Sequence, residues 1–355
     1  GWLTRWDDLS NTWVEHDYDE KGRATKTRCS GGYWEGQLHY DDDNNITSHK
    51  SAFGGISQYF KDDKNRIIAI VDPEGNRTEQ EWDFDNLTAV TDPLGQRTEY
   101  EYDNWGNVTQ VTEPNGQVHT YSYDQNGQLL SYSDPLASTW HYAYNSAGSL
   151  VSVQDPDSRE WRHEYNALGQ RTLTALPDGS ETRYGYNSQG MLERVSPDNS
   201  VGFTFYYDKQ CRLVKRTSDE QLTRRWYYKG NSLSPYQVEY EDGSKTQFEY
   251  DIEGNITAIT DALGNVSRYE YGAFDKLASA TDPLGATTHY HYNVETEFAG
   301  VTNSKGHQWR YEFDALGRVK TERHYDGRKH HFGYDAAGRI VSQTKPNDHV
   351  LQYDY

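Results

Sequence analysis

Two stretches of the 355-residue sequence carry side chains that could bind a metal ion. In the first, Asp41, Asp43 and Asn45 match the first three ligand positions of an EF-hand calcium loop. Such a loop also needs glycine at its sixth position and glutamate at its twelfth, and these positions hold Ile46 and Ala52. We therefore expect a solvated turn here and no calcium site.

The second stretch is rich in histidine. His289 and His291 would share one face of a strand, and His330 and His331 form a second dense pair. Two histidines on a strand do not complete a tetrahedral site without partners from neighbouring strands, and no His-Glu-x-x-His motif is present. We expect polar surface histidines and predict no metal site.

Motifs for nucleophilic or phosphate chemistry are absent from the sequence. There is no Gly-x-Ser-x-Gly elbow and no Gly-x-x-x-x-Gly-Lys phosphate loop. Cys29 and Cys211 are the only cysteines and lie 182 positions apart, so we expect two small buried thiols with no disulfide framework. The prediction is a chain with no catalytic residue, no cofactor and no enzyme activity.

Composition and charge argue against several classes of partner. The chain has 35 Lys plus Arg against 55 Asp plus Glu, which gives a formal net charge of −20 and disfavours binding to nucleic acid or to an anionic membrane. The sequence contains no run of 18 apolar residues, so it predicts no membrane-spanning helix. The first residues lack a signal-peptide pattern. With 30 Tyr, 10 Trp and one Met, burial must come from large rings that suit strands.

These rings recur at a fixed interval of 21 residues, interrupted once by an interval of 22. The ring-bearing positions are Tyr102, Tyr123, Tyr144, Tyr165, Tyr186, Tyr207, Tyr228, Tyr250, Tyr271, Tyr292, Phe313, Tyr334 and Tyr355. The interval loosens toward the N-terminus but continues through Trp82, Tyr40 and Tyr18. Such periodicity predicts a repeat protein that spans essentially the whole chain.

Each repeat contains two turn signals. The ring is followed by Asp or Asn in ten of the twelve units that begin between Tyr102 and Tyr334, a pattern that caps a turn. Glycine, which accepts positive φ, lies four residues after the ring at Gly106, Gly127, Gly148, Gly169, Gly190, Gly254, Gly317 and Gly338. A second turn follows about seven residues later and reads Asp-Pro-Leu-Gly at residues 92–95 and 282–285.

Between the turns lie short segments typical of strands. Residues 98–102 and 267–271 alternate rings with polar side chains, which is the period of a strand with two unlike faces. One repeat is therefore an antiparallel hairpin, and we predict an all-β fold of about 32 strands. A sheet of that size must coil, so the expected architecture is a spiral of hairpins that curls into a shell. A propeller is the competing architecture, but its blades would need repeats of about 40–45 residues, which the 21-residue interval does not match.

We predict one continuous array over residues 1–355, with irregular repeats in 1–58 and regular ones in 59–355, and no linker or separate domain. Residues 208–212 and 293–297 carry Cys211 and Thr296 where glycine is usual, and residues 229–231 read Lys-Gly-Asn. We expect local bends or breaks at these three units.

The repeats resemble the YD repeats of Rhs proteins. The resemblance is carried by Tyr-Asp-Ala-Ala-Gly-Arg-Ile at 334–340, Phe-Asp-Ala-Leu-Gly-Arg-Val at 313–319 and the two Asp-Pro-Leu-Gly turns. Rhs proteins are bacterial polymorphic toxins whose relatives include the B and C components of Tc toxins, the wall-associated protein and the teneurins.

The resemblance implies a β-cage that encloses a C-terminal toxin domain and carries it from the bacterial cytoplasm to a competitor cell, typically by type VI secretion. The implied partners are that toxin, the remaining repeats of the parent chain and components of the secretion system. Teneurin-like relatives suggest an alternative function as a cell-surface module that binds carbohydrate or protein.

The sequence departs from this family pattern at its C-terminal end. Residues 352–355 read Gln-Tyr-Asp-Tyr and begin another unit, without the core segment whose aspartates cut off the toxin in the family. We interpret the chain as a stretch of cage wall and attribute neither autoproteolysis nor toxin activity to it.

Overall fold

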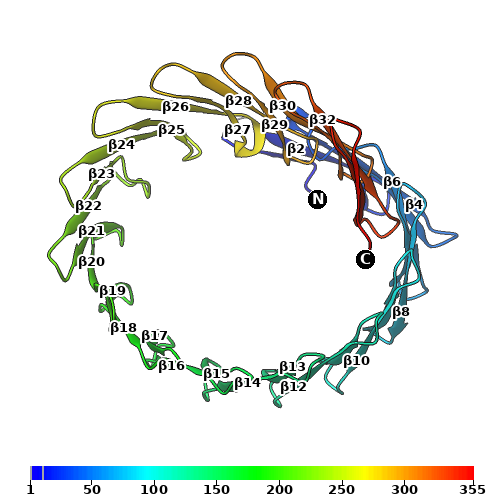
Figure 1. Cartoon of the computed structure of the whole chain (residues 1–355), viewed down its shortest axis with the longest axis horizontal. Helices are drawn as coiled ribbons and strands as arrows, with labels where there is room; N and C mark the ends of the chain where they lie inside the picture. Colours follow the sequence, from blue (N-terminus) through cyan, green and yellow to red (C-terminus); the bar gives the residue numbers. More distant parts are fainter. Residues whose placement is uncertain (1, 10–11) are drawn as a thin grey trace. The chain divides into compact units, whose positions relative to one another are not determined.

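A computed structural model describes residues 2–9 and 12–355 and confirms the all-β prediction. All 34 strands assigned in these residues belong to one antiparallel sheet (Figure 1). The helical elements found there are two short 3-10 turns, Ser30–Gly32 and Ala273–Asp275. Within the described part of the chain, no helix has the length and hydropathy to cross a membrane.

The strands follow each other at intervals of about half a repeat. They are β1 (Arg5–Asp7), β2 (Trp13–Tyr18), β3 (Ala24–Cys29), β4 (Gly36–Asp41), β5 (Ile46–Lys50), β6 (Ile56–Lys61), β7 (Ile67–Val71), β8 (Arg77–Asp83), β9 (Asn86–Thr91), β10 (Arg97–Tyr102), β11 (Val108–Thr112), β12 (Val118–Tyr123), β13 (Leu129–Ser133), β14 (Thr139–Tyr144), β15 (Leu150–Gln154), β16 (Glu160–Tyr165) and β17 (Arg171–Ala175). The list continues with β18 (Glu181–Tyr186), β19 (Leu192–Pro197), β20 (Phe203–Tyr207), β21 (Leu213–Ser218), β22 (Thr223–Tyr227), β23 (Gln237–Glu239), β24 (Lys245–Tyr250), β25 (Ile256–Thr260), β26 (Val266–Tyr271), β27 (Leu277–Thr281), β28 (Thr287–Tyr292), β29 (Phe298–Thr302), β30 (Gln308–Phe313), β31 (Val319–Arg323), β32 (Lys329–Tyr334), β33 (Ile340–Thr344) and β34 (Val350–Gln352).

The strands fall into two compact units. The first unit contains residues 1–97, 249–260 and 264–355, and therefore brings the first and the last repeats together. The second unit contains residues 98–248 and 261–263. Within each unit, successive strands form a ladder of hairpins. The continuity of the array over residues 1–355 stays a prediction from the repeat.

Two kinds of turn alternate along this ladder. We call the turns that follow the periodic ring the ring turns, such as residues 335–339, and the turns at the other end of the strands the proline turns, such as residues 282–286. Both close in the same way: the N–H of Gly338 donates to the carbonyl of Asp335 at 3.0 Å, and the N–H of Gly285 donates to that of Asp282 at 2.9 Å. The two kinds of turn therefore define two opposite edges of the ribbon.

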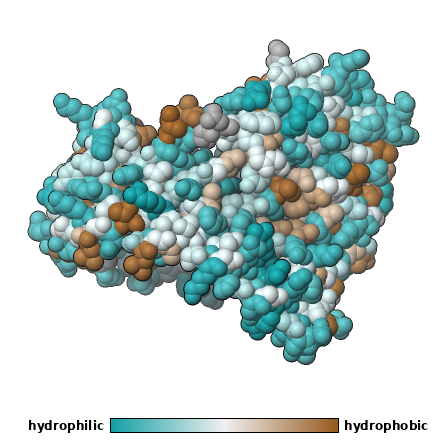
Figure 2. Space-filling model, turned by 90° about the horizontal axis from the view of Figure 1, so that it is seen from above, coloured by the Kyte–Doolittle hydropathy of each residue, from teal (hydrophilic) through white to brown (hydrophobic). Residues whose placement is uncertain are grey.

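Strand alternation gives the ribbon one ring-bearing face and one polar face. In β12, Tyr121 and Tyr123 lie on the first face and are half-buried, whereas Thr120 and Ser122 lie on the second and are exposed. A single sheet covers its rings only partly, so none of the large side chains among the described residues is fully buried. Figure 2 accordingly shows apolar residues as separate patches among hydrophilic ones on the face it presents.

Of the three units where we expected a bend or break, two are regular. Cys211 and Thr296 both adopt φ of 62°, and their N–H groups close the turn as glycine does. The prediction of a break there is wrong because the backbone of both turns adopts the left-handed conformation and closes, despite the strain of a side chain at this position. The third unit is irregular, since β23 after it has three residues. A further irregular turn, which the sequence analysis did not identify, occurs at Ala273–Asp275, with Phe274 at φ of 58°.

The expectation of two buried thiols is confirmed for Cys29 and wrong for Cys211. Cys29 is buried at the end of β3, but Cys211 is exposed. The reason is its place in the repeat: Cys211 occupies the glycine position of a ring turn, which projects beyond the sheet.

Replacing Cys211 with glycine should raise the free energy of unfolding by about 1 kcal/mol. Cysteine is strained at positive φ and glycine is not. The measurement is urea unfolding of both proteins, with Cys211→Ala as the control. Alanine removes the thiol but keeps the strain, so it should leave the stability within about 0.5 kcal/mol of the starting protein. Equal stability of the glycine and alanine variants would contradict the assignment of strain.

Candidate functional site

The predicted ring positions lie at equivalent places in the structure. Each of Tyr102, Tyr123, Tyr144, Tyr165, Tyr186, Tyr207, Tyr250, Tyr271, Tyr292, Phe313 and Tyr334 is the last residue of its strand, and Tyr228 directly follows β22. The eight glycines predicted from the repeat, Gly106, Gly127, Gly148, Gly169, Gly190, Gly254, Gly317 and Gly338, have φ between 75° and 94° in the ring turns that follow. The structure thus distributes these positions along one edge and does not gather them at one place.

The hydroxyl groups of eight periodic tyrosines each join one hairpin to the hairpin before it. Tyr165 donates to the carbonyl of Leu150 at 2.9 Å, across the boundary between β15 and β16. These two strands are paired from Ser152 to Gln154, so the Leu150 carbonyl lies beyond the paired stretch and needs another donor. The same bond, to the residue 15 positions earlier, is made by Tyr186, Tyr207, Tyr228, Tyr271, Tyr292, Tyr334 and Tyr355 at 2.7–3.1 Å.

The aspartate or asparagine that follows most of the rings organises the turn. In the ring turn that follows Tyr334, Oδ1 of Asp335 accepts the N–H groups of Ala337 at 3.0 Å and Arg339 at 2.8 Å. Its Oδ2 accepts Nε of Arg339 at 2.8 Å. One carboxylate therefore fixes the backbone of the turn and the direction of an arginine side chain.

That arginine carries the connection to the next repeat. The guanidinium of Arg339 lies over the ring of Tyr355 at 4.9 Å, and that of Arg318 lies over the ring of Tyr334 at 4.4 Å. The same stacking places Arg23 on Tyr40 and Arg212 on Tyr228. Arginine stacks well on aromatic faces, so each turn contributes to the packing of the following ring.

Protonation supports this arrangement. Burial raises the pKa of Tyr334, so its hydroxyl remains a donor at neutral pH. The side-chain hydrogen bond from Arg66 lowers the pKa of Asp62, and burial opposes this effect. Burial raises the pKa of Asp335, but the hydrogen bonds from Arg339 and Ala337 and the charge of Arg339 together bring it below its ordinary value. The turn carboxylates therefore stay ionised and keep accepting from the backbone.

The first unit contains a second structural feature, in which residues 240 or more positions apart touch. The backbone N–H of Trp34 donates to the carbonyl of Val294 at 2.8 Å, and its indole Nε1 donates to that of Glu295 at 3.1 Å. The N–H of Phe274 donates to the hydroxyl of Thr12 at 3.3 Å, and the Phe274 ring lies 4.4 Å from that of Trp34. We call this contact the seam. It joins the proline-turn edge of the first repeats to ring turns of the last repeats.

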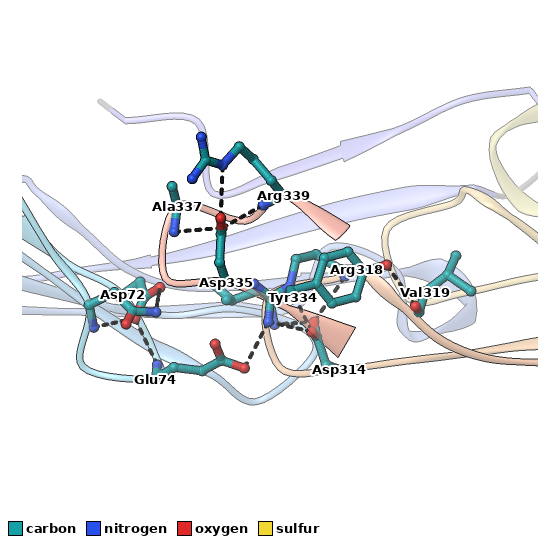
Figure 3. Close-up of polar contacts among 11 residues, drawn as sticks. Asp72, Glu74, Asp314, Arg318, Val319, Tyr334, Asp335, Ala337 and Arg339 are labelled. Atoms are coloured by element: carbon teal, nitrogen blue, oxygen red, sulfur yellow. Dashed lines mark hydrogen bonds and ion pairs between the residues drawn. The ribbon is translucent and has the colours of Figure 1, made fainter. Parts of the chain in front are cut away.

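The seam continues through apolar and charged contacts. The ring of Phe53 lies 5.9 Å from that of Phe313, beside Gly317, where a Cβ would come within 2.8 Å of the Phe53 ring. Arg318 donates to Glu74 at 2.8 Å while it also bonds Asp314 and stacks on Tyr334. Figure 3 shows these polar contacts, and in Figure 1 the first (blue) and last (orange to red) strands of this unit lie side by side.

Beyond Arg318 the seam opens into a cavity of about 590 Å³. Its walls include Ile70 and Pro93 on the proline-turn edge and Leu316 and Arg339 on the ring-turn edge. The two edges therefore separate after the pair of Glu74 and Arg318.

The metal candidates from the sequence do not converge. Asp41 accepts both the N–H and the side-chain amide of Asn44, at 3.1 and 2.8 Å, as a capped turn does. His291 and His331 contact threonine hydroxyls on neighbouring strands, and His330 contacts Gln343. Among residues 2–9 and 12–355, no three His, Cys, Asp or Glu side chains are placed to hold a metal ion.

Sequence reasoning missed the seam and the arginine connection. The seam has no local signal, because its partners are far apart in the chain. The arginine could have been found, since it stands five residues after the ring at Arg23, Arg212, Arg318 and Arg339.

Comparison with known proteins places these features in a family. A family model described as Teneurin YD-shell matches residues 6–202, and one described as RHS Repeat matches residues 237–266 and 250–287. The Probable deoxyribonuclease RhsB of Dickeya dadantii (strain 3937) is 31% identical over 81 residues, which are 23% of this chain and 6% of that protein.

Solved structures share the fold. The Photorhabdus luminescens Tc holotoxin pore matches with a TM-score of 0.77 and 13% identity over 96% of this chain and 22% of that one. A crystal structure of TcdB2-TccC3 matches with a TM-score of 0.60 and 16% identity over 95% of this chain and 20% of that one. The chain thus spans about a fifth of the length of these structures. The Teneurin YD-shell model covers more than half of the chain, and together with the RHS Repeat matches it identifies this chain as a member of the Rhs and teneurin YD-shell family.

Proposed function

We propose that this chain is a stretch of shell wall that encloses a toxin domain, and that its function is structural and not catalytic. The observation that carries the proposal is the seam. A ribbon one sheet thick offers no enclosed space by itself, but a ribbon whose proline-turn edge packs against its own ring turns can build a wall from successive windings. The seam has the hydrogen bonds, ring contacts and ion pair of such a junction.

The shared fold with Tc toxin structures supports this role, and the match to an Rhs protein supports a toxin as the enclosed cargo. In this proposal the partners are the cargo and further repeats of the parent polypeptide. The parent is made in the bacterial cytoplasm and delivered to competitor cells, by type VI secretion in the Rhs manner.

Limited proteolysis of the natural protein that contains this chain tests the proposal. Mass spectrometry would follow the cleavage of every segment outside the repeats, with the same segment expressed alone as the control. We expect at least one segment to be cut about tenfold more slowly inside the intact protein, because a wall excludes the protease. Equal cleavage rates, or a natural protein with no segment beyond its repeats, would overturn enclosure.

A further inference from the structure

The third residue of a turn points beyond the edge of the ribbon, where its own hairpin cannot cover it. In this chain that position often holds a large apolar side chain. Three of these side chains, Phe53, Phe274 and Leu316, lie in the seam or line its cavity, and all three are partly covered. We call the third-position apolar side chains the turn knobs.

Away from the seam, the turn knobs are exposed. The exposed fraction is 76% for Trp105, 87% for Leu136, 79% for Leu168, 88% for Leu263 and 94% for Leu284. Leu94, whose turn borders the seam cavity, has an intermediate value of 45%. A turn knob is thus partly covered where it takes part in the seam or borders its cavity and exposed where it does not, which indicates that the seam is what covers this position.

The seam also shows what a knob on the proline-turn edge meets. Phe53 lies against Gly317, a ring-turn glycine whose missing side chain leaves the space that the Phe53 ring fills. At Gly169 and Gly338, equivalent ring-turn glycines, a Cβ would meet nothing within 4 Å, so the same hollow is open. Beside the hollow, Arg318 meets Glu74, the third residue of the neighbouring proline turn. Knob and hollow therefore occur on opposite edges of the ribbon.

We propose that Leu136 and Leu284 are docking knobs for the ring-turn edge of another stretch of YD repeats, which offers a glycine hollow with an arginine beside it. Both leucines stand on the edge that forms the seam in the first repeats, so the proposed surface continues an interface present in the molecule. Each would bury a leucine side chain that is otherwise almost fully in water. This inference rests on the proposed wall function and specifies how one winding recognises the next.

A second copy of the chain is a suitable probe, because its ring turn at Gly338 offers an open glycine hollow with Arg339 beside it. Sedimentation of the intact chain should show concentration-dependent association. The double variant Leu136→Asp/Leu284→Asp should weaken it by about tenfold or more, since each knob would place a charge in an apolar contact. The matched control is Leu130→Asp, at a leucine that is 39% exposed within β13 and not at a turn. This control should leave association unchanged.

A photo-crosslinker at position 136 locates the partner surface. We expect adducts with ring-turn peptides of the second copy. A chain that stays monomeric, association that survives the double variant while thermal unfolding shows an intact fold, or adducts confined to strand faces would each overturn the proposal. These outcomes differ from failure of the proposed function, because proteolytic protection of a cargo is measured on the natural protein and edge docking on this chain.

Discussion

Replacing Gly55 with alanine should open the seam and lower the free energy of unfolding by about 2–4 kcal/mol. Gly55 is buried in the proline turn that holds Phe53, and its φ is not in the left-handed region. A Cβ at this position would overlap the carbonyl oxygen of Ala315 and lie 2.7 Å from Cγ of Pro73. Neither neighbour is a flexible side chain, so the two edges must move apart. Urea unfolding measures the loss of stability.

The control for Gly55 is Gly272→Ala. Gly272 also lacks a positive φ, and a Cβ there would have an ordinary contact 3.9 Å from the carbonyl of Lys276. This variant should stay within about 0.5 kcal/mol of the starting protein. Hydrogen exchange adds a local measurement: the amide of Trp34, which donates to Val294, should exchange faster in the Gly55 variant. Unchanged protection of Trp34 together with full stability would show that the seam is not a tight contact.

Removing one periodic ring should have an effect of similar size. Tyr165→Ala should cost about 3 kcal/mol, because it deletes an aromatic contact in a thin sheet and leaves the carbonyl of Leu150 without its donor. Tyr165→Phe keeps the ring and removes only the hydroxyl, so it should cost about 1 kcal/mol. The difference between the two variants separates packing from the inter-hairpin hydrogen bond. Chemical unfolding of both variants provides the measurement.

Tyr206 provides the control for the two variants of Tyr165. It precedes a periodic ring by one residue, lies on the other face of β20 and is 42% exposed. Tyr206→Phe should change the stability by less than about 0.5 kcal/mol. If the two Tyr→Phe variants were equally stable, the hydroxyl at the periodic position would have no role in joining hairpins.

The strands and turns could be predicted because each depends on residues close in sequence. The Asp-x-x-Gly turn at Asp335 and the Asp-Pro-Leu-Gly turn at Asp282 encode their own hydrogen bonds, and the 21-residue interval aligns them. The expected breaks at Cys211 and Thr296 were wrong because a backbone held by an Asx cap and two flanking strands tolerates a side chain at positive φ. The cost of one strained residue is about 1 kcal/mol, which the neighbouring pairs offset.

The seam could not be predicted in the same way. Phe53 and Phe313 are 260 positions apart, and their meeting depends on the small twist accumulated by every strand between them. No short sequence motif encodes this accumulated twist. The exposed knobs illustrate the same limit: Leu284 and Leu316 occupy the same position of similar turns, yet the first is 94% exposed and the second lines the seam cavity.

The tyrosine hydrogen bond has a consequence for how such chains change in length. Tyr186 and Tyr207 both reach back 15 residues, which is less than one 21-residue period. Loss or duplication of a whole unit therefore leaves every remaining hydroxyl with an equivalent carbonyl. The seam does not tolerate such a change, because one added unit shifts every later turn by one turn position along the edge that it contacts. Lengthening this protein by whole units thus preserves the tyrosine hydrogen bonds, but each added unit demands a new set of matching partners across the seam.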